Sequence, residues 1–126
     1  MNIPDNLKYT KEHEWIKIDG NIGTIGITDY AQSELGDIVF IDISGDLSEI
    51  TSGESFGTIE AVKTVSDLYA PCNGKIKEIN SKIIDEPQVI NSDPYGDGWL
   101  IKVEITNMAD LKDLMDATAY KAQIGE

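Results

Sequence analysis

The sequence has very few residues that bind soft metals or form cross-links. Cys72 is its only cysteine and His13 its only histidine. A lone cysteine excludes a disulfide within the chain, and one cysteine with one histidine supplies too few ligands for a zinc site. Because Cys72 lies between Pro71 and Asn73, in a stretch typical of a strand edge and a turn, we expect a buried or half-buried structural thiol. We therefore assign no metal-binding residues.

Positive charge is also scarce. Lys and Arg together number 10 against 23 Asp and Glu, which gives a formal net charge of -13. Such a field repels nucleic acid phosphates and anionic lipid headgroups, so we expect neither nucleic acid nor a membrane as a partner. It favours encounter with basic patches on other proteins, although acidic surfaces are common among soluble cytosolic proteins.

Long hydrophobic runs are missing. No apolar run approaches the ~20 residues that span a bilayer, and residues 1–10 have no basic region followed by an apolar stretch and no arginine. These absences exclude a secretory signal and argue against an organelle transit peptide, so we expect a soluble, cytoplasmic protein. The 126 residues, 40% of them hydrophobic, contain no linker-like tract, which predicts a single domain over residues 1–126.

Recognisable catalytic signatures are absent as well. The chain has no G-x-S-x-G nucleophile elbow, no G-x-x-x-x-G-K-[ST] phosphate loop and no G-x-G-x-x-G dinucleotide-binding unit. Carboxylates are plentiful, but their number carries little information in so acidic a chain, so a small carboxylate-based hydrolase stays open as an alternative. We assign no catalytic residues.

The pattern that is present indicates a mainly β fold, because short apolar runs alternate with glycine and Asx turns. Residues 15–18 and 22–27 predict two strands joined by a hairpin turn at residues 19–21. A further strand is expected at residues 37–43, with Val39, Ile41 and Ile43 on one face. Other strands are expected at residues 56–62, 65–70, 75–79 and 98–105. Together they predict a β-sandwich or flattened half-barrel.

Short helices complete the expected fold. Thr28 or Asp29 can cap a helix over residues 30–35, which Gly36 would end. Near the end of the chain, hydrophobic residues return at helical spacing and predict a C-terminal helical segment that continues through residues 119–124. Its apolar face would hold Leu111, Leu114 and Met115, and its cap would be Thr106 or Asn107.

Lys63 stands between two strand-like runs, with no glycine or Asx residue at the bend. Its neighbours Val62 and Thr64 are β-branched and restrict the backbone. A long primary amine is therefore expected on a stiff turn, projecting into water. Judged on these residues alone, an ordinary solvated turn lysine is the commoner explanation.

Seven stretches together carry a resemblance to a known family. They are TKEHEW (10–15), GITDYAQ (26–32), LGDIVF (35–40), GTIEAVK (57–63), SDLYAP (66–71), NG (73–74) and NSDPYGDGWLIK (91–102). In this order and spacing, the chain resembles the glycine cleavage H-protein family along its whole length. Gly53 and Gly74 look like the glycine pair that brackets the modified lysine of lipoyl and biotinyl carriers. Ala61, Cys72 and Glu12 depart from the usual family residues, and none of them is the acceptor lysine.

The resemblance implies a lipoyl/biotinyl-carrier-like sandwich of antiparallel sheets, with Lys63 exposed at the tip of a hairpin. It implies lipoate attached covalently to Lys63 as N6-lipoyllysine, in a carrier that is not itself an enzyme. The carrier would shuttle the aminomethyl group of glycine between three partners: a glycine decarboxylase, an aminomethyltransferase and a dihydrolipoamide dehydrogenase. A lipoate-attaching ligase or transferase would be the fourth partner.

The resemblance also implies roles for four carboxylates. Glu60 matches an acidic position that the attaching enzyme recognises, although a solvated strand glutamate would look the same. Glu14 and Asp67 match a cleft that receives the loaded arm, where they would pair with its ammonium group. Glu12 falls in the same region, and a plain surface charge explains it at least as well. His13 either lines the cleft or makes a structural hydrogen bond.

Three other functions stay open at this point. A biotin carrier shares the hairpin architecture, but biotin carriers typically flank the lysine with methionines, and here the flanking residues are Val62 and Thr64. An H-like relay protein would donate its lipoyl group to 2-oxoacid dehydrogenases, and sequence cannot separate that role from glycine cleavage. The third alternative is an unmodified binding module or small enzyme.

Overall fold

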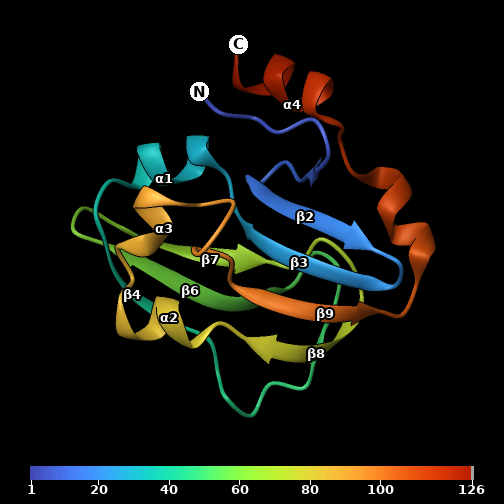
Figure 1. Cartoon of the computed structure of the whole chain (residues 1–126), viewed down its shortest axis with the longest axis horizontal. Coiled ribbons are helices and arrows are strands. Elements are labelled where there is room, and N and C mark those ends of the chain that lie inside the picture. The colour runs from blue at the N-terminus through green and yellow to red at the C-terminus, as the bar shows by residue number, and fades with distance from the viewer. Residues whose placement is uncertain (126) are drawn as a thin grey trace.

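A computed structural model describes residues 1–125 of the chain. Two antiparallel sheets face each other, a six-stranded sheet in the order β1-β2-β3-β9-β8-β5 and a three-stranded sheet in the order β4-β6-β7 (Figure 1). The strands are β1 (Lys8–Tyr9), β2 (Glu14–Asp19), β3 (Ile22–Ile27), β4 (Ile38–Asp42), β5 (Glu49–Ile50), β6 (Ser55–Ala61), β7 (Val65–Tyr69), β8 (Gly74–Ile79) and β9 (Ile101–Ile105). The predicted β-sandwich is confirmed.

Four α-helices and one 3-10 helix are placed around these sheets within the described residues. They are α1 (Asp29–Leu35), α2 (Ser81–Asp85), α3 (Val89–Ser92), the 3-10 helix η1 (Met108–Asp113) and α4 (Ala117–Ile124). Within that part of the chain, no helix is long and apolar enough to cross a membrane.

Local turn and cap residues explain the first half of the fold. Asp19 pairs with Ile22, so β2 and β3 are joined at the hairpin turn that the sequence predicts for residues 19–21, and Gly20 adopts φ +62° there. Thr28 caps α1 by accepting a hydrogen bond from the backbone N–H of Ala31 at 3.1 Å. Gly36 ends α1 at φ +78°, as expected.

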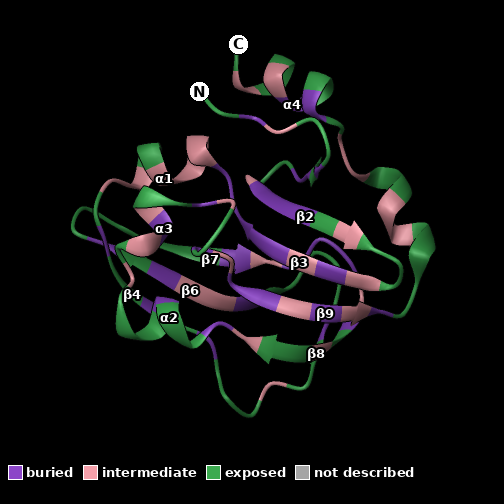
Figure 2. Ribbon diagram, viewed as in Figure 1, coloured by how far each residue is buried: buried purple, intermediate pink, exposed green. Residues whose placement is uncertain are grey.

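Hydrophobic side chains from both sheets form the main core. Figure 2 colours the ribbon purple wherever a residue is buried. A second, smaller cluster fastens both ends of the chain to the six-stranded sheet. It consists of Ile3, Leu7, Tyr9, Trp15, Ala117 and Tyr120. The rings of Tyr9 and Tyr120 stack at 4.7 Å between centroids, so α4 is held against β1.

One predicted face is wrong. Val39 was expected to point inward with Ile41, but Val39 is 49% exposed, whereas Ile38 and Ile41 are buried. The pairing register of β4 with β6 shifts between Ile38 and Phe40. This bulge inserts one extra residue into β4 and breaks the two-residue alternation on which the prediction rested.

The C-terminal segment also differs from the prediction. Its expected single helical face is split, because Leu114 is extended and Met115 pairs with Tyr9. The cap at Asn107 is correct for η1, while α4 has its own cap at Asp116. In the rest of the chain, β9 begins at Ile101, later than expected, and the strand expected at residues 75–79 has a shift in its pairing register with β9 between Ile76 and Glu78.

Candidate functional site

Lys63 lies in the loop that joins β6 to β7, at one end of the three-stranded sheet (Figure 1). Two backbone hydrogen bonds hold this loop. The N–H of Ala61 donates to the carbonyl of Thr64 at 2.8 Å, and the N–H of Val62 donates to the carbonyl of Asp37 at 3.0 Å. The turn is thus closed on itself and tied to the start of β4, which explains how it stays rigid without glycine.

The side chain of Lys63 is exposed, but it leans over the end of α1. A β-carbon added at Gly36 would lie 2.9 Å from Cε of Lys63 and 3.3 Å from its Nζ. Gly36 directly follows Leu35, a residue that lines the nearby pocket. The amine therefore lies beside the C-terminal end of α1, and Lys63 is not itself one of the residues that line the pocket.

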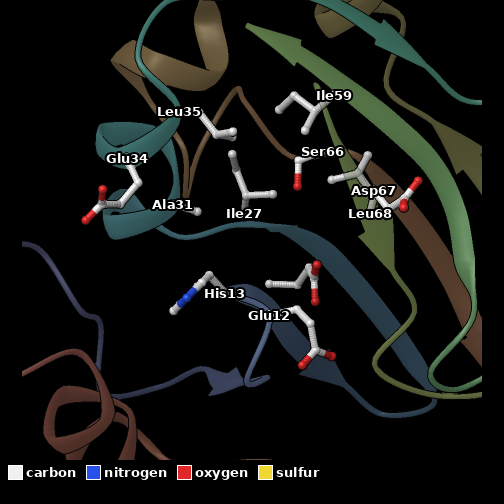
Figure 3. Close-up of a pocket in the computed structure, with 11 residues that line it drawn as sticks. Glu12, His13, Ile27, Ala31, Glu34, Leu35, Ile59, Ser66, Asp67 and Leu68 are labelled. Atoms are coloured by element: carbon white, nitrogen blue, oxygen red, sulfur yellow. The ribbon is translucent and has the colours of Figure 1, made fainter. Parts of the chain in front are cut away.

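The pocket is a cavity of about 140 Å³ between α1, the start of β2 and the β6–β7 hairpin (Figure 3). Its apolar part comes from Ile27, Ala31, Leu35, Ile59 and Leu68. Its polar part comes from Glu12, His13, Glu14, Glu34, Ser66 and Asp67. An apolar floor with several carboxylates suits a ligand that is apolar along its length and cationic at its end.

Glu14 is the most buried of these carboxyl groups, with 1% of its surface exposed. The hydroxyl of Thr10 donates to its Oε1 at 2.6 Å, and the backbone N–H of Tyr69 donates to its Oε2 at 3.2 Å. Burial raises the pKa of Glu14 to about 8, and the two hydrogen bonds oppose that rise only in part. Near neutral pH this carboxyl is therefore mostly protonated.

His13 connects the pocket to the C-terminal helix. It adopts φ +71°, and its Nδ1 lies 2.8 Å from the hydroxyl of Tyr120. That hydroxyl also lies 2.8 Å from Oγ1 of Thr28, the cap of α1. Burial lowers the pKa of His13, although Glu12 and Glu34 act in the opposite direction. The imidazole both lines the pocket and makes a structural hydrogen bond.

The residues predicted for the site fall in two places. Glu12, Glu14 and Asp67 line the same pocket. Glu60 does not, because it is exposed on β6, where it pairs with Phe40 on one side and Val65 on the other. Their roles stay predictions.

Sequence reasoning missed Glu34 and Ser66 in the pocket lining. Glu34 had a usable signal, because Ala31, Glu34 and Leu35 recur at helical spacing on one face of α1. Ser66 had none, since the pocket side of β7 could be assigned only once its pairing with Ile59 was known.

Cys72 and Gly53 lie outside the pocket lining and have structural roles. Cys72 is fully buried, and burial raises the pKa of its thiol to about 11, which confirms the expected structural thiol. Gly53 donates its N–H to the carbonyl of Ala70 at 2.9 Å, at the base of the Lys63 hairpin. In residues 1–125, no three His, Cys, Asp or Glu residues are grouped so that they could hold a metal ion.

A hydrogen-bonded hairpin that presents an exposed lysine near an apolar, acid-lined cleft is typical of carrier domains. The family model described as Glycine cleavage H-protein matches residues 7–126. The chain belongs to the glycine cleavage H-protein family, and its function is that of the lipoyl carrier in glycine cleavage.

Individual relatives agree with this assignment. The chain is 56% identical to the glycine cleavage system H protein of Carboxydothermus hydrogenoformans, over 98% of this chain and 95% of the relative. It is 53% identical to that of Symbiobacterium thermophilum, over 96% and 94% of the two chains. The crystal structure of a glycine cleavage system H protein from Mycobacterium marinum is similar at a TM-score of 0.90 and 41% identity, covering 98% of this chain and all of the other.

Proposed function

We propose that Lys63 carries lipoate as an amide on its Nζ, forming N6-lipoyllysine, and that the chain itself catalyses no step. The main support is the exposed amine on a hydrogen-bonded turn, beside the end of a helix whose residues Ala31, Glu34 and Leu35 line an apolar cleft. Once attached, the lipoyl group supplies a disulfide that can take up the aminomethyl group of glycine and later release it. Tethering keeps that cargo at a high effective concentration for each partner.

The cleft is proposed to protect the cargo. A free amine on the carbon beside sulfur can expel the thiolate, whereas an ammonium group has no lone pair with which to do so. Glu14 and Asp67 would face this ammonium group, with Glu12 beside them. The apolar floor would exclude water from the same space.

Glu14 is suited to supply the proton as well as the counter-charge. In the empty cleft its carboxyl holds a proton, since its pKa is raised to about 8. When a neutral amine enters, the carboxyl can transfer that proton to it, which leaves an ammonium group beside a carboxylate. Hydrogen bonds from Thr10 and Tyr69 are already directed at the two oxygens that would bear the charge.

We further propose that the carrier meets four partners: the glycine decarboxylase, the aminomethyltransferase, the dihydrolipoamide dehydrogenase and a lipoate-attaching enzyme. The lipoate-attaching enzyme would recognise Glu60. The expected cytoplasmic location also stays a prediction.

The decisive experiment is the intact mass of the protein after incubation with a lipoate ligase, lipoate and ATP, followed by peptide mapping. We expect one lipoyl increment on the peptide that holds Lys63, and none in Lys63→Ala. No increment under conditions that fully modify a known carrier would disprove the attachment. An increment on Lys82, Lys102 or another lysine would move the site.

A further inference from the structure

The turn that carries Lys63 is not held by packing of its side chains. Residues 62–67 are all exposed, and the side chain of Val62, directly before the lysine, is 73% exposed. The backbone N–H of Val62 donates to the carbonyl of Asp37 at 3.0 Å, and this bond ties the turn to the segment between α1 and β4. The position of Lys63 therefore depends on where the carbonyl of Asp37 points.

The carbonyl of Asp37 belongs to the peptide group that joins Asp37 to Ile38. The N–H of the same peptide group donates to Oδ1 of Asn91, in α3, at 2.9 Å. No cis peptide bond is found in residues 1–125, and a trans peptide group is planar, with its N–H and its C=O pointing in opposite directions. By holding the N–H on one side, Asn91 directs the carbonyl toward Val62 on the other.

Asn91 also uses the nitrogen of its amide. Its Nδ2 donates to the carbonyl of Gly36 at 2.9 Å and to Oε1 of Gln32 at 3.1 Å. These partners fix the orientation of the amide, because the N–H of Ile38 can only donate and the carbonyl of Gly36 can only accept. The two backbone groups belong to the peptide groups on either side of Asp37, so one side chain holds both of them.

Asn91 is anchored in turn by α1, which packs beside α3 (Figure 1). Nε2 of Gln32 donates to Oδ1 of Asp29, the first residue of α1, at 2.8 Å. At the other end of the helix, Gly36 is the residue that the Lys63 side chain leans over. Asn91 thus holds both backbone features on which the placement of Lys63 depends.

We propose that Asn91 is a positioning residue for the acylation of Lys63. This inference rests on the proposed attachment of lipoate. In that step Nζ attacks an activated lipoyl carbonyl, an ester or an anhydride. The C–N bond forms, the bond from the carbonyl to its leaving group breaks, and one amine proton is released. Asn91 acts through the Asp37–Ile38 peptide group and Val62, and not on the amine itself.

The kinetic consequence of positioning differs from that of a direct role in the chemistry. The enzyme that acylates Lys63 has to find Nζ in one place, so only molecules with an ordered turn are competent to bind. If that fraction falls, the apparent affinity falls by the same factor, whereas the rate at saturation is kept. Loss of Asn91 should therefore raise KM for the carrier and leave kcat unchanged.

The test compares the same substitution at two asparagines of the whole chain. Asn91→Leu keeps a branched side chain of similar shape and removes the three hydrogen bonds. Asn80→Leu is the matched control, because Asn80 accepts from the N–H of Lys82 and donates to the carbonyls of Asp97 and Trp99, which are all outside the Lys63 hairpin. Asn91→Asp and Asn80→Asp keep the accepting oxygen, and they repeat the comparison if a leucine variant does not fold.

Two measurements are made on each variant. Amide hydrogen exchange by NMR reports the bond of the Val62 N–H, and initial rates with a purified lipoate ligase, lipoate and ATP give kcat and KM for the carrier. For Asn91→Leu we expect exchange at Val62 about tenfold faster and KM about tenfold higher at the parental kcat, as for a turn ordered in about one molecule in ten. Asn91→Asp should change both less. Asn80→Leu should lower the urea midpoint but keep the parental Val62 exchange and KM.

Three results would overturn the proposal. The first is a folded Asn91→Leu variant with the parental KM, which would leave Lys63 as the attachment site but remove the positioning role. The second is an equal rise of KM in Asn80→Leu, which would reduce the effect to a general loss of stability. The third is a raised KM with parental exchange at Val62, which would break the proposed route through that residue. A parent protein that takes no lipoyl group would defeat the proposed function itself, before any variant is compared.

Discussion

At the scale of single residues, burial of Glu14 makes the stability of the fold depend on pH. The folded protein keeps the Glu14 proton up to about pH 8, whereas the unfolded chain loses it near the ordinary pKa of 4.5. Between these values the folded state binds more protons, so raising the pH lowers the free energy of unfolding. The stability that comes from keeping Glu14 protonated is fully present below pH 4.5, and it is lost above about pH 8.

Glu14→Gln should therefore flatten part of the pH profile. In a glutamine the amide oxygen can accept from the N–H of Tyr69, and the amide nitrogen can donate to Oγ1 of Thr10, whose hydroxyl then accepts instead of donating. The urea midpoint of the variant should fall less between pH 5 and pH 8 than that of the parent. Glu12→Gln, at an exposed carboxyl two residues earlier, is the control for the same replacement without burial. Parallel curves for parent and Glu14→Gln would show that Glu14 titrates normally.

Gly36 combines a backbone role with a contact to the lysine. Its φ of +78° and ψ of -155° fall in a region that other residues occupy only with strain of about 1–3 kcal/mol. Gly36→Ala should cost that much, and its methyl group should also push the Lys63 side chain aside.

Gly20→Ala is the matched control for Gly36→Ala. Gly20 also has a positive φ, but a β-carbon there would meet nothing within 4 Å. Both variants should lose stability in urea unfolding. Only Gly36→Ala should change the rate of lipoyl transfer to Lys63, and equal rates in the two variants would show that the contact has no effect on attachment.

At the scale of elements, α4 is predicted to act as a support for the cleft. The Tyr120 hydroxyl joins His13 of the pocket to Thr28 of the α1 cap, at 2.8 Å from each. Tyr120→Phe keeps the ring stacked on Tyr9 but leaves the buried Thr28 and the half-buried His13 short of a hydrogen bond, which should cost about 1–3 kcal/mol. Tyr69→Phe is the control, because its hydroxyl makes only a long, exposed contact of 3.4 Å with Asp67.

A second measurement tests whether Tyr120 maintains the cleft in addition to stabilising the fold. In lipoylated, loaded protein, Tyr120→Phe should shorten the lifetime of the cargo, because α1 and His13 form part of the cleft. An unchanged lifetime in a measurably destabilised variant would limit Tyr120 to a purely structural role.

The elements that sequence could predict are those specified by neighbouring residues. The β2–β3 turn and the α1 caps follow from residues within a few positions of each other. The β4 bulge could not be predicted in this way, because it depends on pairing with β6. The break in the helical pattern at Leu114 and Met115 could not be predicted either, because it depends on the pairing of Met115 with Tyr9. Helices α2 and α3 are too short, at 5 and 4 residues, to show a periodic pattern.

At the scale of the whole molecule, the cleft is assembled from three segments far apart in the chain, near residues 12–14, 27–35 and 59–68. Physical reading of the sequence could identify Lys63 as a stiff-turn lysine, but no local pattern could bring Glu14 to Asp67. That juxtaposition was expected only from the family resemblance. The burial that raises the pKa of Glu14 is a property of the assembled fold alone.

The predicted single domain over residues 1–126 can be tested with two probes that the chain already contains. Trp15 is in the second cluster and Trp99 packs against it, so tryptophan fluorescence reports the end of the molecule that holds α4. Cys72 is fully buried in the main core, so the reaction of its thiol with an aromatic disulfide reports the opening of that core.

If the chain is one domain, both probes should change together as urea is raised, with one midpoint and one slope. The physical reason is that β2 supplies Trp15 to the second cluster and the adjacent Ile16 to the main core, so one cluster cannot open without disturbing a strand of the other. Cys72→Ser, followed by fluorescence, checks that the thiol reagent does not itself drive unfolding. A fluorescence transition that is complete before Cys72 becomes reactive would instead divide the chain into a stable sandwich and a separately melting terminal cluster, and the support that α4 gives the cleft would then be lost before the carrier hairpin unfolds.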